Sequence, residues 1–152
     1  RALGANPQKM AFSEVYQALQ TGVVDGTENT PSNLYTQKMH EVQKFVAMTN
    51  HGYIGYAVIA NKKFWDGLPA DIRKALDEAM KEATKFANQQ AAKDNEDALE
   101  AVKKSGKSQI LVLTDAEKAQ MKKALVGVHK ENEGRIGRET IEAVYKVTGF
   151  KA

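Results

Sequence analysis

Residues 12–29 read Phe-Ser-Glu-Val-Tyr-Gln-Ala-Leu-Gln-Thr-Gly-Val-Val-Asp-Gly-Thr-Glu-Asn, and this run stands out from the rest of the chain. Its apolar side chains recur at helical spacing on one face, at Phe12, Val15, Tyr16 and Leu19. Gly22 is expected to end this helix. The apolar pair Val23-Val24 then predicts a very short strand, and Asp25-Gly26 predicts a turn, because both residue types tolerate the backbone angles of turns.

The residues that follow this run predict a short helix and two strands. The helix opens at Pro31 or Ser32 and continues to about Lys38. Strands are expected at residues 41–49 and 53–60, and the second is apolar almost throughout, which suits a strand buried on both faces. Between them lies Asn50-His51-Gly52, a polar break of the kind where ligand-binding groups gather in α/β proteins.

The longest predicted element is a helix that begins after Leu68-Pro69. Residues 71–105 contain neither glycine nor proline, and Gly106 closes the run. Apolar residues keep the i, i+3, i+4 spacing of one helix face through the first half and become sparse beyond Ala91. At ~1.5 Å per residue, one continuous helix would be about 52 Å long. We therefore expect it to cross two lobes or to bend near residues 93–97.

The C-terminal part predicts a strand and two helices. Ile110 to Leu113 form a short apolar run with strand character. Thr114 and Glu117 match a capping box, in which the threonine hydroxyl and the glutamate carboxylate each accept from a free backbone N–H. This helix is expected to reach about residue 133, and a last helix covers residues 137–147.

Composition and charge exclude several functions. The 22 basic residues are interspersed with 19 acidic ones, giving a net charge of +3, so no basic face for nucleic acid is expected. There is no cysteine, and the three histidines stand far apart, so we expect no metal site. No phosphate-binding glycine loop or nucleophile elbow is present. We therefore expect no catalytic residues, no cofactor and no enzymatic activity.

The run at residues 12–29 also resembles the signature of a known family. It is similar to the "E-x-Y-x-A-L-Q-x-G-x-V-D-G-x-E-N" block of solute-binding proteins of the tripartite ATP-independent periplasmic (TRAP) dicarboxylate transporters. The resemblance continues in order through residues 41–45, 49–51 and 65–69, so it covers nearly the whole chain. It implies a receptor that captures a small organic carboxylate in the periplasm and delivers it to the membrane permease.

The resemblance also implies a fold and its division. The fold is α/β, the C-terminal part of a two-lobed class II periplasmic-binding-protein-like fold, helix-rich and with a long crossing helix. Residues 1–48 would belong to ligand-binding lobe 2, and residues 49–70 to a hinge strand and part of lobe 1. Residues 71–106 would form the crossing helix, and residues 107–152 the C-terminal strand and helices.

Four residues are implied as ligand-binding by their match to the family pattern. Asn29 corresponds to an asparagine whose amide donates to the bound carboxylate, and Phe12 to an aromatic that packs on the ligand's carbon skeleton. His51 corresponds to a histidine that lines the cleft near the hinge. Glu28 is expected to orient the others, because a carboxylate repels an anionic solute. The residues alone also allow Phe12 to be a core residue, His51 a hydrogen-bonded hinge histidine and Asn29 a turn residue.

Two departures from the family pattern bear on binding. Members read Glu-Asn-Pro, whereas here Thr30 precedes Pro31, which changes the loop after Asn29. Members also hold the carboxylate with an arginine upstream of the Leu3-Gly4-Ala5 segment, and Arg1 comes too late to match it. We therefore expect a C-terminal half, a fragment that lacks this arginine, binds carboxylates weakly by itself and covers its exposed apolar faces as a homodimer.

The alternative from another functional class is a helical protein–protein interaction module. In that hypothesis the long amphipathic helix binds a partner helix. It accounts for residues 69–148 and leaves the first sixty unexplained.

Overall fold

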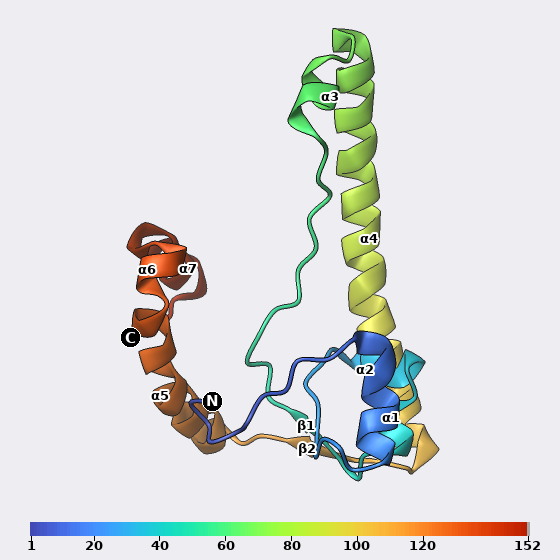
Figure 1. Cartoon of the computed structure of the whole chain (residues 1–152), viewed down its shortest axis with the longest axis vertical. Coiled ribbons are helices and arrows are strands. Elements are labelled where there is room, and N and C mark those ends of the chain that lie inside the picture. The colour runs from blue at the N-terminus through green and yellow to red at the C-terminus, as the bar shows by residue number, and fades with distance from the viewer. Residues whose placement is uncertain (152) are drawn as a thin grey trace. The chain divides into compact units, whose positions relative to one another are not determined.

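The computed structural model describes residues 1–151, and their contacts divide the chain into two compact units. The core unit comprises residues 11–46 and 50–110, and the terminal unit comprises residues 1–10, 47–49 and 111 onward. Figure 1 shows the course of the chain through their elements. The described residues that are buried all belong to the core unit: Val15, Ala18, Leu19, Met39, His40, Ala98, Val102 and Ser108.

The core unit begins with the helix predicted from residues 12–21. A 3-10 turn, η1 (Phe12–Glu14), leads into α1 (Val15–Gln20), whose buried side chains are Val15, Ala18 and Leu19. The chain leaves this helix through Gly22 at φ +72°. The N–H groups of Val23 and Val24 both donate to the carbonyl of Ala18, at 2.9 and 3.3 Å. These donors are therefore used at the helix end, so the short strand predicted for this pair does not form.

The second part of the core unit is a pair of short helical elements. α2 (Pro31–Thr36) begins after Thr30, whose hydroxyl accepts from the N–H of Asn33. Pro31 occupies the first turn, where its missing N–H costs nothing. η2 (Met39–Glu41) follows Lys38, which adopts a left-handed conformation with φ +56°. Thr30 is thus the helix cap that gives the loop after Asn29 its shape.

The long predicted helix is confirmed as one uninterrupted element. α4 (Ala70–Ser105) continues through residues 93–97, and Gly106 ends it in the left-handed conformation at φ +65°. Its buried residues, Ala98 and Val102, lie in its C-terminal half, where α2 packs beside it (Figure 1). A short helix, α3 (Lys62–Asp66), precedes it and was not predicted, although Asn61 caps it by accepting from the N–H of Phe64.

The sheet of the described residues has two strands, β1 (Phe45–Met48) and β2 (Gln109–Val112), which pair with each other. Both coincide with predicted strands. The strand predicted at residues 53–60 is wrong: the segment has no regular structure, and Tyr53, Tyr56 and Ile59 are about nine-tenths exposed, at 91%, 90% and 89%. A strand forms only with a hydrogen-bonding neighbour, and no strand within residues 1–151 pairs with this segment.

Three helices lie within the described residues of the terminal unit. α5 (Asp115–Glu131) opens with the predicted capping box of Thr114 and Glu117, and α6 (Glu133–Ile136) follows it directly. α7 (Arg138–Thr148) ends at Gly149. His129 Nδ1 lies 2.6 Å from the hydroxyl of Tyr145, and both rings contact Phe150. Among the described helices of the chain, none has the length and apolar character needed to cross a bilayer.

Candidate ligand-binding site

Asn29 lies at the centre of a small polar network just before α2. Its side-chain oxygen Oδ1 accepts from the backbone N–H of Thr30 at 2.9 Å and from the side-chain Nδ2 of Asn33 at 2.7 Å. Asn33 is the third residue of α2, and its own N–H donates to the capping hydroxyl of Thr30 at 3.4 Å. The network is half-buried, so the start of α2 determines where the Asn29 side chain points.

These contacts settle the orientation of the Asn29 amide. A backbone N–H can only donate, so the atom that faces Thr30 must be the carbonyl oxygen and not the amide nitrogen. Both lone pairs of that oxygen are then occupied by Thr30 and Asn33. Among the contacts of residues 1–151, none uses Asn29 Nδ2, so the amide presents two N–H donors and no acceptor. Acceptor oxygens, such as those of a carboxylate, complement such donors.

A second contact anchors the start of α2 to the long helix. The N–H of Ser32 donates to Oδ1 of Asn95 on α4 at 3.1 Å, and Nδ2 of Asn95 donates to the carbonyl of Ala91 at 2.9 Å. The helix dipole and the free N–H groups at the start of α2 make an amide oxygen a favourable neighbour there. Asn95 therefore ties the start of α2, which follows Asn29, to α4.

The structure brings together two other predicted site residues, Glu28 and His51. Glu28 Oε2 lies 3.5 Å from His51 Nε2, with the glutamate side chain 69% exposed and the histidine side chain 37% exposed. The two residues come from the loop before α2 and from the polar break after β1. Glu28 is also adjacent to Asn29 in the chain, and its role in orienting the other site residues stays a prediction.

Phe12, the fourth predicted residue, lies in η1 and is 46% exposed. It is therefore not a core residue, unlike its helical neighbours Val15 and Leu19. Within residues 1–151, no hydrogen bond, ion pair or ring contact joins Phe12 to Glu28 or Asn29. An aromatic ring left half-exposed at the start of a buried helix keeps a flat apolar face available for a ligand.

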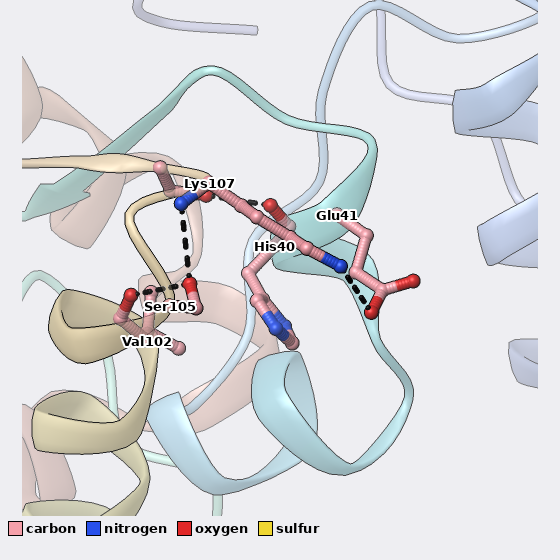
Figure 2. Close-up of polar contacts among 6 residues, drawn as sticks. His40, Glu41, Val102, Ser105 and Lys107 are labelled. Atoms are coloured by element: carbon pink, nitrogen blue, oxygen red, sulfur yellow. Dashed lines mark hydrogen bonds and ion pairs between the residues drawn. The ribbon is translucent and has the colours of Figure 1, made fainter.

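A separate cluster ties the chain after α4 to η2 (Figure 2). Lys107 Nζ lies 2.9 Å from Oε1 of Glu41, and the Lys107 N–H donates to the Ser105 hydroxyl at 3.2 Å, as Figure 2 shows. The Ser108 hydroxyl lies 2.7 Å from each of the carbonyl oxygens of His40 and Gln43. These contacts fix the turn through which α4 leads into β2.

The charges and rings of this cluster have a structural role. The hydrogen bond from Lys107, and secondarily its charge, lower the pKa of the Glu41 carboxyl below its ordinary value. His40 is buried and stacks on Tyr35 with 5.2 Å between ring centroids, and its Nδ1 has no hydrogen-bond partner within the described residues. Nowhere in residues 1–151 do three or more metal-ligating side chains gather. The cluster stabilises η2 and the turn before β2.

Sequence reasoning missed the contacts of three residues around Asn29: Thr30 and Asn33, which bond to it, and Asn95, which bonds to the neighbouring Ser32. Thr30 followed by Pro31 is a readable helix start, since a capping hydroxyl before a proline in the first turn is a common combination. Asn33 then falls where a side chain can reach back over the cap. Asn95 gives no local signal, because its contact joins parts of the chain that are distant in sequence.

Comparison with known proteins begins with a family profile. The profile described as bacterial extracellular solute-binding protein, family 7, matches residues 1–134. The chain is 60% identical over 147 residues to the C4-dicarboxylate-binding periplasmic protein DctP of Rhodobacter capsulatus, covering 97% of this chain and 44% of that protein. The chain thus spans less than half the length of this relative.

Solved structures give the same picture of the fold. A TRAP periplasmic solute-binding protein of Shewanella oneidensis with bound succinate is similar at a TM-score of 0.87 and 40% identity, over 93% of this chain and 47% of that one. A second, of Pseudomonas aeruginosa with bound L-malate, is similar at a TM-score of 0.80 and 35% identity, over 86% of this chain and 45% of that one. The predicted fold class, part of a two-lobed and helix-rich α/β binding protein, is confirmed.

Proposed function

This chain belongs to family 7 of the bacterial extracellular solute-binding proteins, and from that premise we propose that it serves a TRAP transporter as its substrate-binding subunit. Its ligand would be a small organic carboxylate, of the C4-dicarboxylate class named for its relatives. The protein would capture this ligand in the periplasm and deliver it to the membrane permease. It would act by binding and closure, without catalysis or a cofactor.

The observation that carries this proposal is the orientation of the Asn29 amide. Its oxygen is occupied by Thr30 and Asn33, so only N–H donors remain for a ligand. A neutral donor binds a carboxylate without bringing a second charge that must be desolvated. The half-exposed ring of Phe12 would supply an apolar face for the ligand, and the paired Glu28 and His51 would supply a polar edge.

The proposed division of the chain follows the two-lobed fold. Residues 1–48, with Phe12, Glu28 and Asn29, would belong to ligand-binding lobe 2. Residues 49–70, with His51, would form the hinge and part of lobe 1, residues 71–106 the crossing helix, and residues 107–152 the C-terminal elements. Continuity of α4 over its full length supports a helix that transmits lobe movement as one rigid body.

Calorimetric titration of the full-length protein with succinate tests the proposal. Asn29→Ala removes the donor and should weaken binding by roughly tenfold or more, since a hydrogen bond to a charged group contributes about 1.5–3 kcal/mol. Asn88→Ala is the matched control, because Asn88 is an exposed residue of α4. Phe12→Ala should also weaken binding, whereas Phe86→Ala, which removes a ring that is 68% exposed on α4, should not.

The same four variants separate this function from the helical interaction module. Exposed apolar side chains on α4, such as Ile72 and Phe86, are the observation that favours that alternative. If α4 only binds a partner helix, Phe86→Ala will weaken binding of that partner and Asn29→Ala will not. Absence of carboxylate binding by the wild-type protein, or equal affinities of Asn29→Ala and Asn88→Ala, would refute the receptor proposal.

A further inference from the structure

We propose that Asn33 is a positioning residue that sets the ligand specificity of the site by holding the Asn29 amide with its N–H groups outward. The inference rests on the proposed function, because it assumes that Asn29 donates to a bound carboxylate. Asn33 does not itself need to touch the ligand. Its Nδ2 donates to Asn29 Oδ1 at 2.7 Å, which is the shorter of the two bonds to that oxygen.

Asn33 can do this because the start of α2 fixes its position. Pro31 stands in the first turn, and the Thr30 hydroxyl accepts from the Asn33 N–H, so the backbone at residue 33 is held by the helix cap. The adjacent N–H of Ser32 is bonded to Asn95 on α4. The Asn33 side chain therefore extends back toward Asn29 from a well-supported position, and a displacement of its amide would break a short bond.

The arrangement distinguishes acceptor ligands from donor ligands. An asparagine amide has a donor end and an acceptor end, and a loop that left both free could rotate to suit either kind of ligand. Occupying Oδ1 twice removes that choice and leaves two donors. A ligand group that carries only acceptors, such as a carboxylate, fits them, whereas an ammonium group, which carries only donors, meets donor against donor. The chemical class selected is thus an anion with acceptor oxygens.

The sharpest perturbation is Asn33→Asp, which keeps the shape of the side chain and replaces its donor by acceptors. A carboxylate at residue 33 repels Asn29 Oδ1 and attracts Asn29 Nδ2, so the amide turns or moves from its place. The fold should tolerate this change, because an acidic residue in the first turn of a helix is favourable. Thermal unfolding should therefore occur at or above the wild-type temperature, which separates loss of geometry from loss of structure.

The test is a double-mutant cycle measured as the dissociation constant for succinate of the full-length protein. Asn33→Asp should weaken binding by roughly tenfold or more in the wild-type background, which corresponds to the loss of a hydrogen bond to a charged ligand. In the Asn29→Ala background it should change the constant by less than about twofold, because its effect passes through Asn29. Gln37→Glu, which adds the same charge at the exposed C-terminal end of α2, is the control and should stay within about twofold of wild type.

Each outcome decides the matter. If Asn33→Asp weakens binding equally in both backgrounds, the added charge repels the ligand directly and the positioning role is wrong. If Asn33→Asp behaves like Gln37→Glu, Asn33 does not hold the amide. If the wild-type protein does not bind succinate, or if Asn29→Ala binds as tightly as wild type, the proposed function itself fails, and that result is distinct from the first two.

Discussion

Met39→Ala is the most direct test of how the core unit is held together. Met39 lies in η2, is completely shielded from solvent and, with Val102, is one of the two largest fully buried side chains of the described residues. Alanine at this position removes the thioether side chain beyond Cβ and leaves a cavity that neighbouring helices fill only in part. Substitutions of this kind cost about 2–5 kcal/mol in free energy of unfolding. η2 has only three residues and depends on packing for its stability. We therefore expect Met39→Ala to lower the free energy of unfolding by about 3 kcal/mol, within that range.

Urea unfolding of the full-length protein, followed by circular dichroism, measures this loss. With a denaturant dependence of about 2 kcal/mol per molar urea, a loss of about 3 kcal/mol lowers the midpoint by about 1.5 M. Met80→Ala is the matched control, because Met80 is only half-buried on α4 and alanine has the higher helix propensity. It should cost less than about 1 kcal/mol. Midpoints that differ by less than about 0.25 M between the two variants would show that η2 is not part of the cooperative core.

Two further predictions concern the end of α4 and the pH dependence of stability. Gly106→Ala should lower the free energy of unfolding by about 1 kcal/mol, because alanine is strained at φ +65°; no atom lies within 4 Å of the added Cβ, so the backbone strain is the whole cost. Gly127→Ala, inside α5, should raise the free energy of unfolding by a similar amount, because alanine has the higher helix propensity. Thermal unfolding of both variants measures these changes. Lys107→Met should return the pKa of Glu41 toward its ordinary value, which NMR titration of that carboxyl measures. Because the pKa of Glu41 is lowered in the folded wild type, this carboxyl stabilises the protein above its unfolded pKa, and the stabilisation is lost as the pH falls through its folded pKa. This loss of stability should be smaller in Lys107→Met. An unchanged titration of Glu41 in that variant would exclude the contact with Lys107 as the cause of the lowered pKa.

The helices could be predicted from the sequence because their signals are local. α4 ends at Gly106 as expected, since only a residue that accepts positive φ can close a helix in that way. The capping box of Thr114 and Glu117 forms as its spacing predicts. α1 buries Val15 and Leu19 on the face that their spacing defined. Each of these features depends on residues within a few positions of one another.

The strands were less predictable because their stability depends on distant partners. β1 and β2 have each other as neighbours, whereas residues 53–60 have the composition of a buried strand and no pairing strand within residues 1–151. The short strand predicted at Val23 and Val24 does not form for a different reason. Their N–H groups are captured by the carbonyl of Ala18 at the end of α1, so a helix-end motif competes with strand pairing for the same donors.

The predicted site residues came from the family pattern and not from their own chemistry. Glu28 and His51 lie 3.5 Å apart, yet nothing in their spacing along the chain indicates this contact. The predicted role of Asn29 came from its place in the Glu-Asn pair, and the structure adds the orientation of its amide. Thr30, which departs from the family pattern, caps α2 and donates its N–H to Asn29, so the departure contributes to the site.

Comparison of two single variants separates the stability of the core unit from the geometry of the site. Met39→Ala removes packing from η2 and leaves the contacts of Asn29 in place, so the folded fraction should bind succinate with wild-type affinity. Asn33→Asp keeps the packing and changes the contacts, so a fully folded protein should bind weakly. If Met39→Ala weakens binding at temperatures where it is fully folded, the position of α2 on α4 depends on the core as much as on the bond from Ser32 to Asn95. Affinity measured well below the unfolding transition of each variant distinguishes these cases.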